Sequence, residues 1–290
     1  MPFSFDTEDR SLEAALRRIA GHELDAAVAQ IARPGPVPAA GIHDIRKRIK
    51  KLRGLLRLLR PGFAEYAVEN AALRDAGQHL SGQRDAEVRL ATFDRLFPEP
   101  TPALLPFRHH LSALRDEAHS TPGGTADATG ILLDLRQRAT AWTLKGKDRS
   151  ILQKGLSETR RRAIATLEDA QEAPEIDPMH EWRKRAKDHW YQARLLTPIW
   201  PEVMAPIANA ASDLTEDLGD HHDLGVLVEH GVTVAKQVLT AAALRQLTKA
   251  TTAAQRKIEA RAFPLGHRIF AGDPDQMARL WVEWWHHWRG

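Results

Sequence analysis

Basic side chains recur at helical spacing in the first third of the chain. His43, Arg46, Lys50, Arg53 and Arg57 follow one another at steps of three or four residues, and an α-helix places residues with this spacing on one face. At about 1.5 Å per residue the stripe is roughly 21 Å long, which is more than a small metabolite needs. Clustered cations repel one another until an anion neutralises them, so the stripe predicts a surface for an extended polyanion. A solvated face with salt bridges to neighbouring helices is the alternative.

A second stretch repeats this pattern 137 positions later. Trp190 stands at the position that corresponds to Arg53, so an aromatic ring interrupts the second stripe. Recurrence of the stripe within one chain favours binding over a merely solvated face. The basic members of the second stripe are His180, Arg183, Lys187 and Arg194.

The histidine at the head of each stripe is expected near a helix start. Asp177 and Pro178 predict that start for the second basic helix, because aspartate caps a helix and proline suits its first position. His180 would then lie in the first turn, where free backbone N–H groups favour anions, and we expect His43 to lie likewise. A histidine there can donate to a phosphate oxygen, although neighbouring cations oppose its protonation. A capping or interhelical hydrogen bond is the alternative role for either histidine.

An apolar stripe lies one residue behind each basic stripe, about 100° around the helix. Each helix is therefore expected to bury one side and present the other for binding. In the second apolar stripe His189 is the polar member, and we interpret it as a histidine with its hydrogen bonds satisfied or one at the boundary of the core. The two apolar stripes are Ile42, Ile45, Ile49, Leu52, Leu56 and Leu59, and Met179, Trp182, Ala186, His189, Ala193 and Leu196.

Composition limits the class of protein. The 290 residues are 43% hydrophobic, which is enough for a sizeable core, and carry a formal net charge of only +3. The stretch from His43 to Arg60 nevertheless holds eight Lys or Arg against one Asp, so the charge is local. The absence of cysteine excludes disulfides, thiolate nucleophiles and cysteine-bound metals. Because residues 1–10 lack the apolar core of a signal peptide and no apolar run could span a bilayer, we expect a soluble cytoplasmic protein.

The organisation of the chain predicts an all-α protein. Ala, Leu, Arg, Glu and Gln dominate, and apolar residues recur at three- and four-residue spacing. Each basic helix runs into a proline-containing exit, at Pro61 or Pro198, and a following helix ends near Asp85 or Asp223. These parallels predict two antiparallel four-helix bundles related by internal duplication. The expected division is residues 1–120 for the first bundle, 121–130 for a linker and 131–290 for the second bundle.

Four tryptophans form one face near the end of the chain. Trp281, Trp284, Trp285 and Trp288 have the spacing i, i+3, i+4 and i+7. A terminal helix that docks on the core is the commonest use of this spacing, and a membrane contact or a dimer interface is the alternative.

Both basic segments resemble the signature helices of the CHAD family, the conserved histidine α-helical domain. The resemblance rests on the segments 43–53 and 180–187, together with 84–88 and 222–226, which are similar to the family's R-D-x-x-V element. It implies two packed four-helix bundles with pseudo-twofold symmetry and a basic surface or channel that binds inorganic polyphosphate without catalysis. Trp190 in the second stripe and His222 in place of the usual arginine are departures, and they imply weaker binding by the second half.

The resemblance and the stripes together give the expected site. We expect polyphosphate, and other polyanions with it, to contact side chains of both helices, while Asp85 and Asp223 cap helices or orient the basic groups. Arg48, Arg185, Arg160 and Arg161 could add contacts at the edges. No catalytic residue, metal or cofactor is expected, and polyphosphate granules are a candidate place of accumulation in the cytoplasm. The expected contact residues are His43, Arg46, Lys47, Lys50, Arg53, Arg57, His180, Arg183, Lys184, Lys187 and Arg194.

A metal-dependent HD-type phosphohydrolase is one alternative. His43 is followed by Asp44, and His222 by Asp223, and such pairs can hold divalent ions. The internal comparison disfavours this function, because Glu181 stands at the position of Asp44 and Arg84 at that of His222.

Binding of RNA or DNA is the second alternative, since a nucleic-acid backbone offers the same phosphates with the same salt dependence. Proteins that bind single strands use several exposed rings as stacking platforms. Only Trp190 interrupts the basic face here, and no recognised nucleic-acid-binding motif accompanies it.

Overall fold

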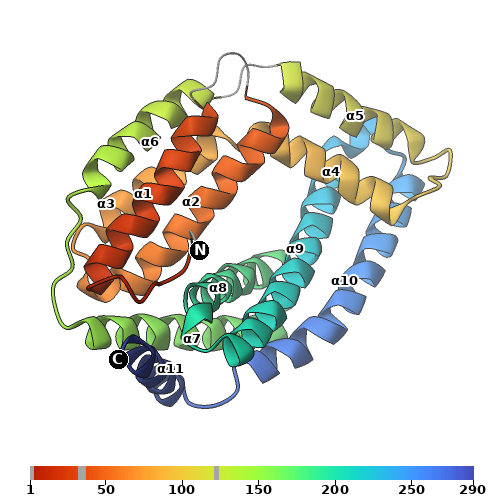
Figure 1. Ribbon diagram of the computed structural model, residues 1–290. Helices are drawn as coiled ribbons and strands as arrows, with labels where there is room; N and C mark the ends of the chain where they lie inside the picture. The colour runs from red at the N-terminus through yellow and green to blue at the C-terminus, as the bar shows by residue number, and fades with distance from the viewer. Residues whose placement is uncertain (1–2, 32–36, 121–123) are drawn as a thin grey trace.

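The computed structural model describes residues 3–31, 37–120 and 124–290, and no strand occurs among them. The prediction of an all-α fold is therefore confirmed (Figure 1). The helices are α1 (Leu12–Ile31), α2 (Ala39–Leu59), α3 (Tyr66–His79), α4 (Gly82–Leu96), α5 (Leu105–Ser120), α6 (Thr125–Ala139), α7 (Asp148–Glu172), α8 (Ile176–Leu195), α9 (Pro201–Val238), α10 (Ala241–Ile269) and α11 (Pro274–Arg289), with the 3₁₀ turns η1 (Arg60–Gly62) and η2 (Thr197–Ile199).

The described helices pack around three apolar clusters. The largest cluster joins α1, α2, α3 and α6 to α7, α8 and α11, and a second lies among α7, α8, α9 and α10. A third cluster joins α4 and α5 to α9 and α10, with Phe93 and Phe107 in T-shaped contact at its centre. Helices from the first part of the chain thus complete a core with helices from the last part. Figure 1 shows the result as a frame of helices in which α2, α4, α8 and α9 surround the middle. The internal duplication expected from the sequence stays a prediction.

The segment expected as a linker is largely helical. Thr125 begins α6, which runs to Ala139 and packs on α1 and α3, while residues 121–123 lie outside the described part. Ala128, Leu132 and Leu135 recur at helical spacing and are buried against those helices. Apolar periodicity thus makes residues 125–130 helical despite the glycines and threonines that suggested a linker, while the division into two bundles stays a prediction.

The two basic helices, α2 and α8, cross at close range. A Cβ added to Gly54 of α2 would lie 2.8 Å from Cβ of Tyr191 on α8, so glycine allows the approach. A Cβ added to Gly155 of α7 would lie only 1.8 Å from the backbone oxygen of Leu58 on α2. Close contact with both α7 and α8 fixes α2 against the last part of the chain.

Both apolar stripes are buried, as the spacing predicts. All twelve members lie in the core, including His189, which is 3% exposed and packs against Phe270 and Trp281. Burial, with the charge of Arg160, lowers the pKa of His189 to about 3, so this histidine is neutral at physiological pH. His189 is therefore a core residue, but its Nε2 is buried without a hydrogen-bond partner among the described residues, so the expectation of a satisfied or boundary histidine is not confirmed.

The helix starts differ from those expected. Helix α8 begins at Ile176 after Glu175, and α2 begins at Ala39, so His180 and His43 are each the fifth helical residue. Their backbone N–H groups lie beyond the free donors of the first turn. The placement of the two histidines in the first turn was therefore wrong. A residue N-terminal to the Asp-Pro pair already adopts helical geometry, which sequence capping rules did not anticipate.

Helix α11 docks on the core through its tryptophans. Trp281 and Trp285 are buried, and Trp284 and Trp288 pack on the same cluster from partly buried positions. The docking interpretation of this aromatic face is confirmed. Within the described residues, no helix has the length and apolar character required to cross a membrane.

Candidate functional site

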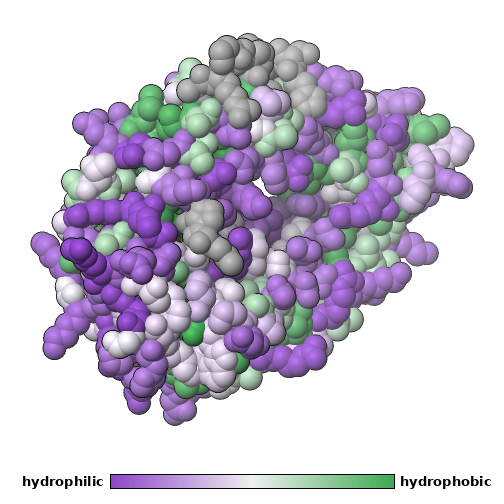
Figure 2. Space-filling model, viewed as in Figure 1, coloured by the Kyte–Doolittle hydropathy of each residue, from purple (hydrophilic) through white to green (hydrophobic). Residues whose placement is uncertain are grey.

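The two basic helices face a central cavity of about 740 Å³. Helices α2, α4, α8 and α9 each contribute a wall, and Figure 2 shows an opening near the centre of the molecule where these helices meet. The cavity is rich in cations and contains two carboxylates. Its charged or titratable lining consists of His43, Arg46, Lys47, Lys50, Arg84, Asp85, Arg89, Arg183, Lys187, His222 and Asp223, together with Tyr191.

Lys50 and Lys187 bring one ammonium group from each basic helix to this cavity. The Lys50 side chain is reached by water, yet the concave walls remove part of its hydration and lower its pKa to about 8, with the charges of Lys187 and Arg46 adding to the effect. Burial, followed by the charge of Arg183, likewise lowers the pKa of Lys187 to about 8. No described carboxylate lies within ion-pair distance of either ammonium, although the charges of Glu216 and Asp223 act on Lys187 from farther away. The two groups therefore repel each other until an anion enters.

Arg46 and Arg183 are the equivalent arginines of the two stripes. The Arg46 guanidinium donates to the backbone oxygen of Gly77 at 2.8 Å, which fixes its direction. Burial lowers the pKa of both arginines, and the nearby charges of Asp85 and Asp223 oppose that shift. Nε of Arg183 is buried without a hydrogen-bond partner among the described residues. A buried guanidinium donor without a partner favours a ligand that brings an acceptor.

Asp85 and Asp223 lie in the cavity wall beside the arginines. They act on Arg46 and Arg183 through charge. Burial raises the pKa of Asp223, which shows that its carboxylate is incompletely compensated. Their assignment as orienting groups stays a prediction.

The three histidines near the cavity are held in their neutral forms. His43 lines the cavity directly, and burial with the charges of Arg84 and Lys50 lowers its pKa. His180 lies behind the lining, where its ring is tilted against that of His222, with 4.1 Å between the ring centres. Burial lowers the pKa of His180 and brings that of His222 to about 4. The histidines can donate hydrogen bonds from a neutral ring but carry little charge at neutral pH.

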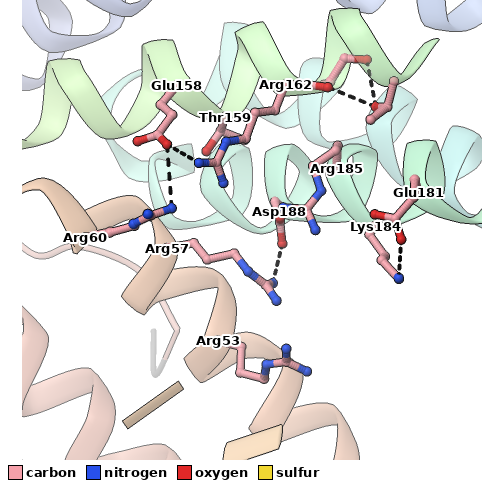
Figure 3. A network of polar contacts seen from close by, with 12 residues as sticks. Arg53, Arg57, Arg60, Glu158, Thr159, Arg162, Glu181, Lys184, Arg185 and Asp188 are labelled. Atoms are coloured by element: carbon pink, nitrogen blue, oxygen red, sulfur yellow. Dashed lines mark hydrogen bonds and ion pairs between the residues drawn. The ribbon is translucent and has the colours of Figure 1, made fainter. Parts of the chain in front are cut away.

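Five of the predicted contact residues do not line the cavity: His180, behind the lining, and four that lie elsewhere. Arg53 donates to Asn70 at 3.1 Å, and burial with the charge of Arg57 lowers its pKa to about 10. Arg57 donates to the buried carboxylate of Asp188 at 2.5 Å. Lys184 pairs with Glu181 at 2.5 Å on the exposed side of α8 (Figure 3). Arg194 lies one pocket away, between the rings of Trp190 and Phe3.

The edge residues also have partners within the fold. Arg185 pairs with Asp188 at 3.2 Å, and Figure 3 shows its guanidinium and that of Arg57 beside the same carboxylate. The other three edge arginines bind acceptors outside the cavity: Arg48 binds Asp44 and Glu23, Arg160 donates to the backbone oxygen of Ala271, and Arg161 binds Asp275. These four arginines therefore bind groups of the fold itself and do not line the cavity.

Arg84, Arg89 and His222 line the cavity but were not among the predicted contact residues. Arg84 could have been predicted from the sequence, because it precedes Asp85 in the element that resembles the family's R-D-x-x-V motif. Arg89 follows Asp85 by one helical turn and could have been found from that spacing. Sequence comparison noted His222 only as a departure from arginine.

The described residues contain no group of three or more His, Asp or Glu that could hold a metal ion. Asp44 is engaged by Arg48 at 2.7 Å, and His221 by Glu259 at 3.0 Å. Of the two His-Asp pairs of the HD-type alternative, Asp44 of the first is thus engaged by an arginine, and His221, next to the second pair, has its own carboxylate partner.

The fold and this cavity define an all-α protein in which two basic helices converge on one cationic space. Residues 10–231 match the CHAD domain family, and the chain belongs to that family. The crystal structure of the CHAD domain from the plant Ricinus communis is similar, with a TM-score of 0.59 and 18% sequence identity over 98% of this chain and 95% of that one. At this identity the likeness concerns the fold. No curated protein matches the chain.

Proposed function

We propose that this protein binds inorganic polyphosphate in its central cavity without chemically altering it. The observation that supports this proposal most directly concerns Lys50 and Lys187. The two lysines come from different basic helices, line the same cavity, and have no ion-paired carboxylate among the described residues. A chain of phosphates supplies closely spaced negative charges that can neutralise both ammonium groups at once. Such neutralisation offsets the mutual repulsion that the folded protein otherwise carries.

The remaining lining supports the same ligand class. Arg46, Arg183, Arg84 and Arg89 add four guanidinium groups around the two lysines. Guanidinium donors match phosphate oxygens in geometry as well as in charge. Asp85 and Asp223 leave the charged lining with an excess of cations, so an anion remains favoured.

Calorimetric titration with long-chain polyphosphate at near-physiological salt tests the proposal. The matched comparison is single-stranded RNA with the same number of phosphates. We expect polyphosphate to bind at least about tenfold more tightly than RNA, a difference of about 1.4 kcal/mol. The reason is that the cavity offers cations with few exposed rings on which bases could stack. The affinity should fall steeply with salt, because each phosphate contact releases counterions.

The competing outcomes are distinct. RNA binding equal to or stronger than polyphosphate binding would replace the proposal with a nucleic-acid function. Absence of binding to either polymer would leave the cations as a structural feature. Loss of phosphate from the polymer during incubation, measured as released orthophosphate, would contradict binding without catalysis. If binding holds, a fluorescently tagged chain should gather at polyphosphate granules in cells that form them, which would support the proposed cytoplasmic location.

A further inference from the structure

Trp190 separates the central cavity from a second pocket of about 430 Å³ and lines both spaces. This side pocket lies between α8 and the first half of α9, with Lys51 of α2 and the segment at Phe3 closing it. The indole is partly buried and packs on Tyr191. One aromatic side chain therefore forms the boundary between the cavity and its neighbour.

Cations from both spaces contact the Trp190 ring. The Lys187 ammonium of the cavity lies 5.3 Å from the ring centre, and the Arg194 guanidinium of the side pocket lies 5.1 Å from it. Both distances are within the range of a cation–π interaction. The ring thus connects a cavity lysine to a side-pocket arginine.

Arg194 is held by aromatic rings. Its guanidinium also lies 5.9 Å from the centre of the Phe3 ring. It forms no hydrogen bond or ion pair with the described residues, so its N–H donors are available at the pocket. The other cation of the side pocket, Lys51, is paired with the buried Glu23 at 2.9 Å. Arg194 is therefore the side-pocket cation that can receive an anion.

We propose that the side pocket is a second anion subsite, in which Arg194 binds phosphates of a polyphosphate chain that leaves the central cavity past Trp190. This inference rests on the proposed function and adds a selection for chain length. A cavity of about 740 Å³ has the size that encloses a small ligand. A short chain can therefore be bound wholly within the central cavity, whereas a long chain also reaches Arg194.

The test measures the affinities of the full chain for tripolyphosphate and for long-chain polyphosphate. Arg194→Gln should weaken binding of the long chain about tenfold and change that of tripolyphosphate less than about twofold. The slope of log affinity against log salt for the long chain should become shallower by about one phosphate contact. Arg245→Gln is the matched control, because Arg245 is exposed on α10 and lines neither space. Competition with the long chain gives the tripolyphosphate affinity if direct titration does not.

Trp190 provides a second measurement. Trp190→Phe keeps an aromatic ring for Arg194 and should retain most of the length selectivity, whereas Trp190→Leu should lose it. Melting curves verify that each variant is folded. Equal losses for both ligands in Arg194→Gln, or a loss no larger than in Arg245→Gln, would overturn the subsite and leave cavity binding intact. If the unaltered protein binds neither polyphosphate, the proposed function fails together with the subsite.

Discussion

Arg57 on α2 donates to the carboxylate of Asp188 on α8 at 2.5 Å, across 131 positions of sequence. Arg185, one turn before Asp188, approaches the other carboxylate oxygen at 3.2 Å. The Asp188 side chain is 4% exposed, so the pair is shielded from water. This contact ties the two basic helices together next to the point where Gly54 and Tyr191 meet, and so helps to fix the distance across the cavity.

Removing the carboxylate should destabilise the protein. Asp188→Asn leaves Arg57 and Arg185 without their counter-charge, and we expect the free energy of unfolding to fall by about 3 kcal/mol. Urea unfolding followed by circular dichroism measures the change. Asp75→Asn is the control, since Asp75 pairs with Arg74 on the exposed surface and such pairs contribute about 0–1 kcal/mol. Equal effects of the two substitutions would show that the buried pair does not hold the helices.

Lysines inside and outside the cavity should differ in their effect on binding. Lys50→Gln and Lys187→Gln should each weaken polyphosphate binding about tenfold, or about 1.4 kcal/mol, because each removes a cavity charge. Lys184→Gln loses the same charge from the same helix as Lys187, but Lys184 is exposed and paired with Glu181. We therefore expect it to change the affinity less than about twofold. Calorimetry with all three variants would contradict the cavity site if Lys184→Gln were as harmful as Lys187→Gln.

Binding should weaken as the pH rises through about 8. Lys50 and Lys187 have pKa values lowered to about 8 in the free protein, and an anion favours their charged forms. Binding is thus strongest below pH 8. At pH 9 each lysine is mostly neutral in the free protein and must take up a proton to bind the anion, which lowers the affinity about tenfold per lysine. Calorimetry near pH 8 in buffers of different ionisation heat should detect proton uptake. A variant with both lysines changed to arginine should lose most of this dependence; an unchanged pH profile in that variant would assign the effect to other groups.

Through the same two lysines, a rise in pH should increase the stability of the fold although it weakens binding. Because their pKa values in the folded chain lie below the ordinary 10.5, the unfolded chain binds more protons between about pH 8 and 10.5. Their contribution to stability therefore increases with pH in that window and is least favourable below pH 8. Lys187→Met should accordingly raise the free energy of unfolding at pH 7, by about 1 kcal/mol, while it weakens binding. Destabilisation by this substitution would contradict the repulsion between the cavity cations.

Gly155→Ala should disrupt the packing of α7 on α2. The added methyl group would lie 1.8 Å from the Leu58 carbonyl oxygen, and backbone cannot move aside as a flexible side chain can. We expect a loss of about 3 kcal/mol in the free energy of unfolding. Gly130→Ala in α6 is the control, because nothing lies within 4 Å of the added atom and alanine favours the helix by about 0.5–1 kcal/mol. Thermal melting should therefore shift in opposite directions for the two variants.

The spacing of residues in the sequence predicts much of the secondary structure. It also predicts the basic lining residues that α2 and α8 contribute to the cavity. Apolar residues at three- and four-residue steps become buried because a helix has only one side to turn toward the core, and both stripes obey this rule. The same geometry places Arg46 with Lys50 on one face of α2 and Arg183 with Lys187 on one face of α8, and all four residues line the cavity. Turn and capping residues misled for α6, where the apolar period prevails over glycines and threonines, and for the start of α8, which precedes the Asp-Pro pair.

The sequence by itself determined which cations share a helix face, since helical periodicity is a local property of the chain. Only the tertiary structure decided which of those cations remain available to a ligand. Arg57 is neutralised by Asp188, whereas Lys50, two turns earlier on the same face, meets no carboxylate in the described chain. Arg194 is directed to a second pocket by the rings of Trp190 and Phe3. Asp188 and Phe3 each lie more than a hundred positions from the arginine they contact. Only the packing of the chain brings them within reach of a hydrogen bond or a ring.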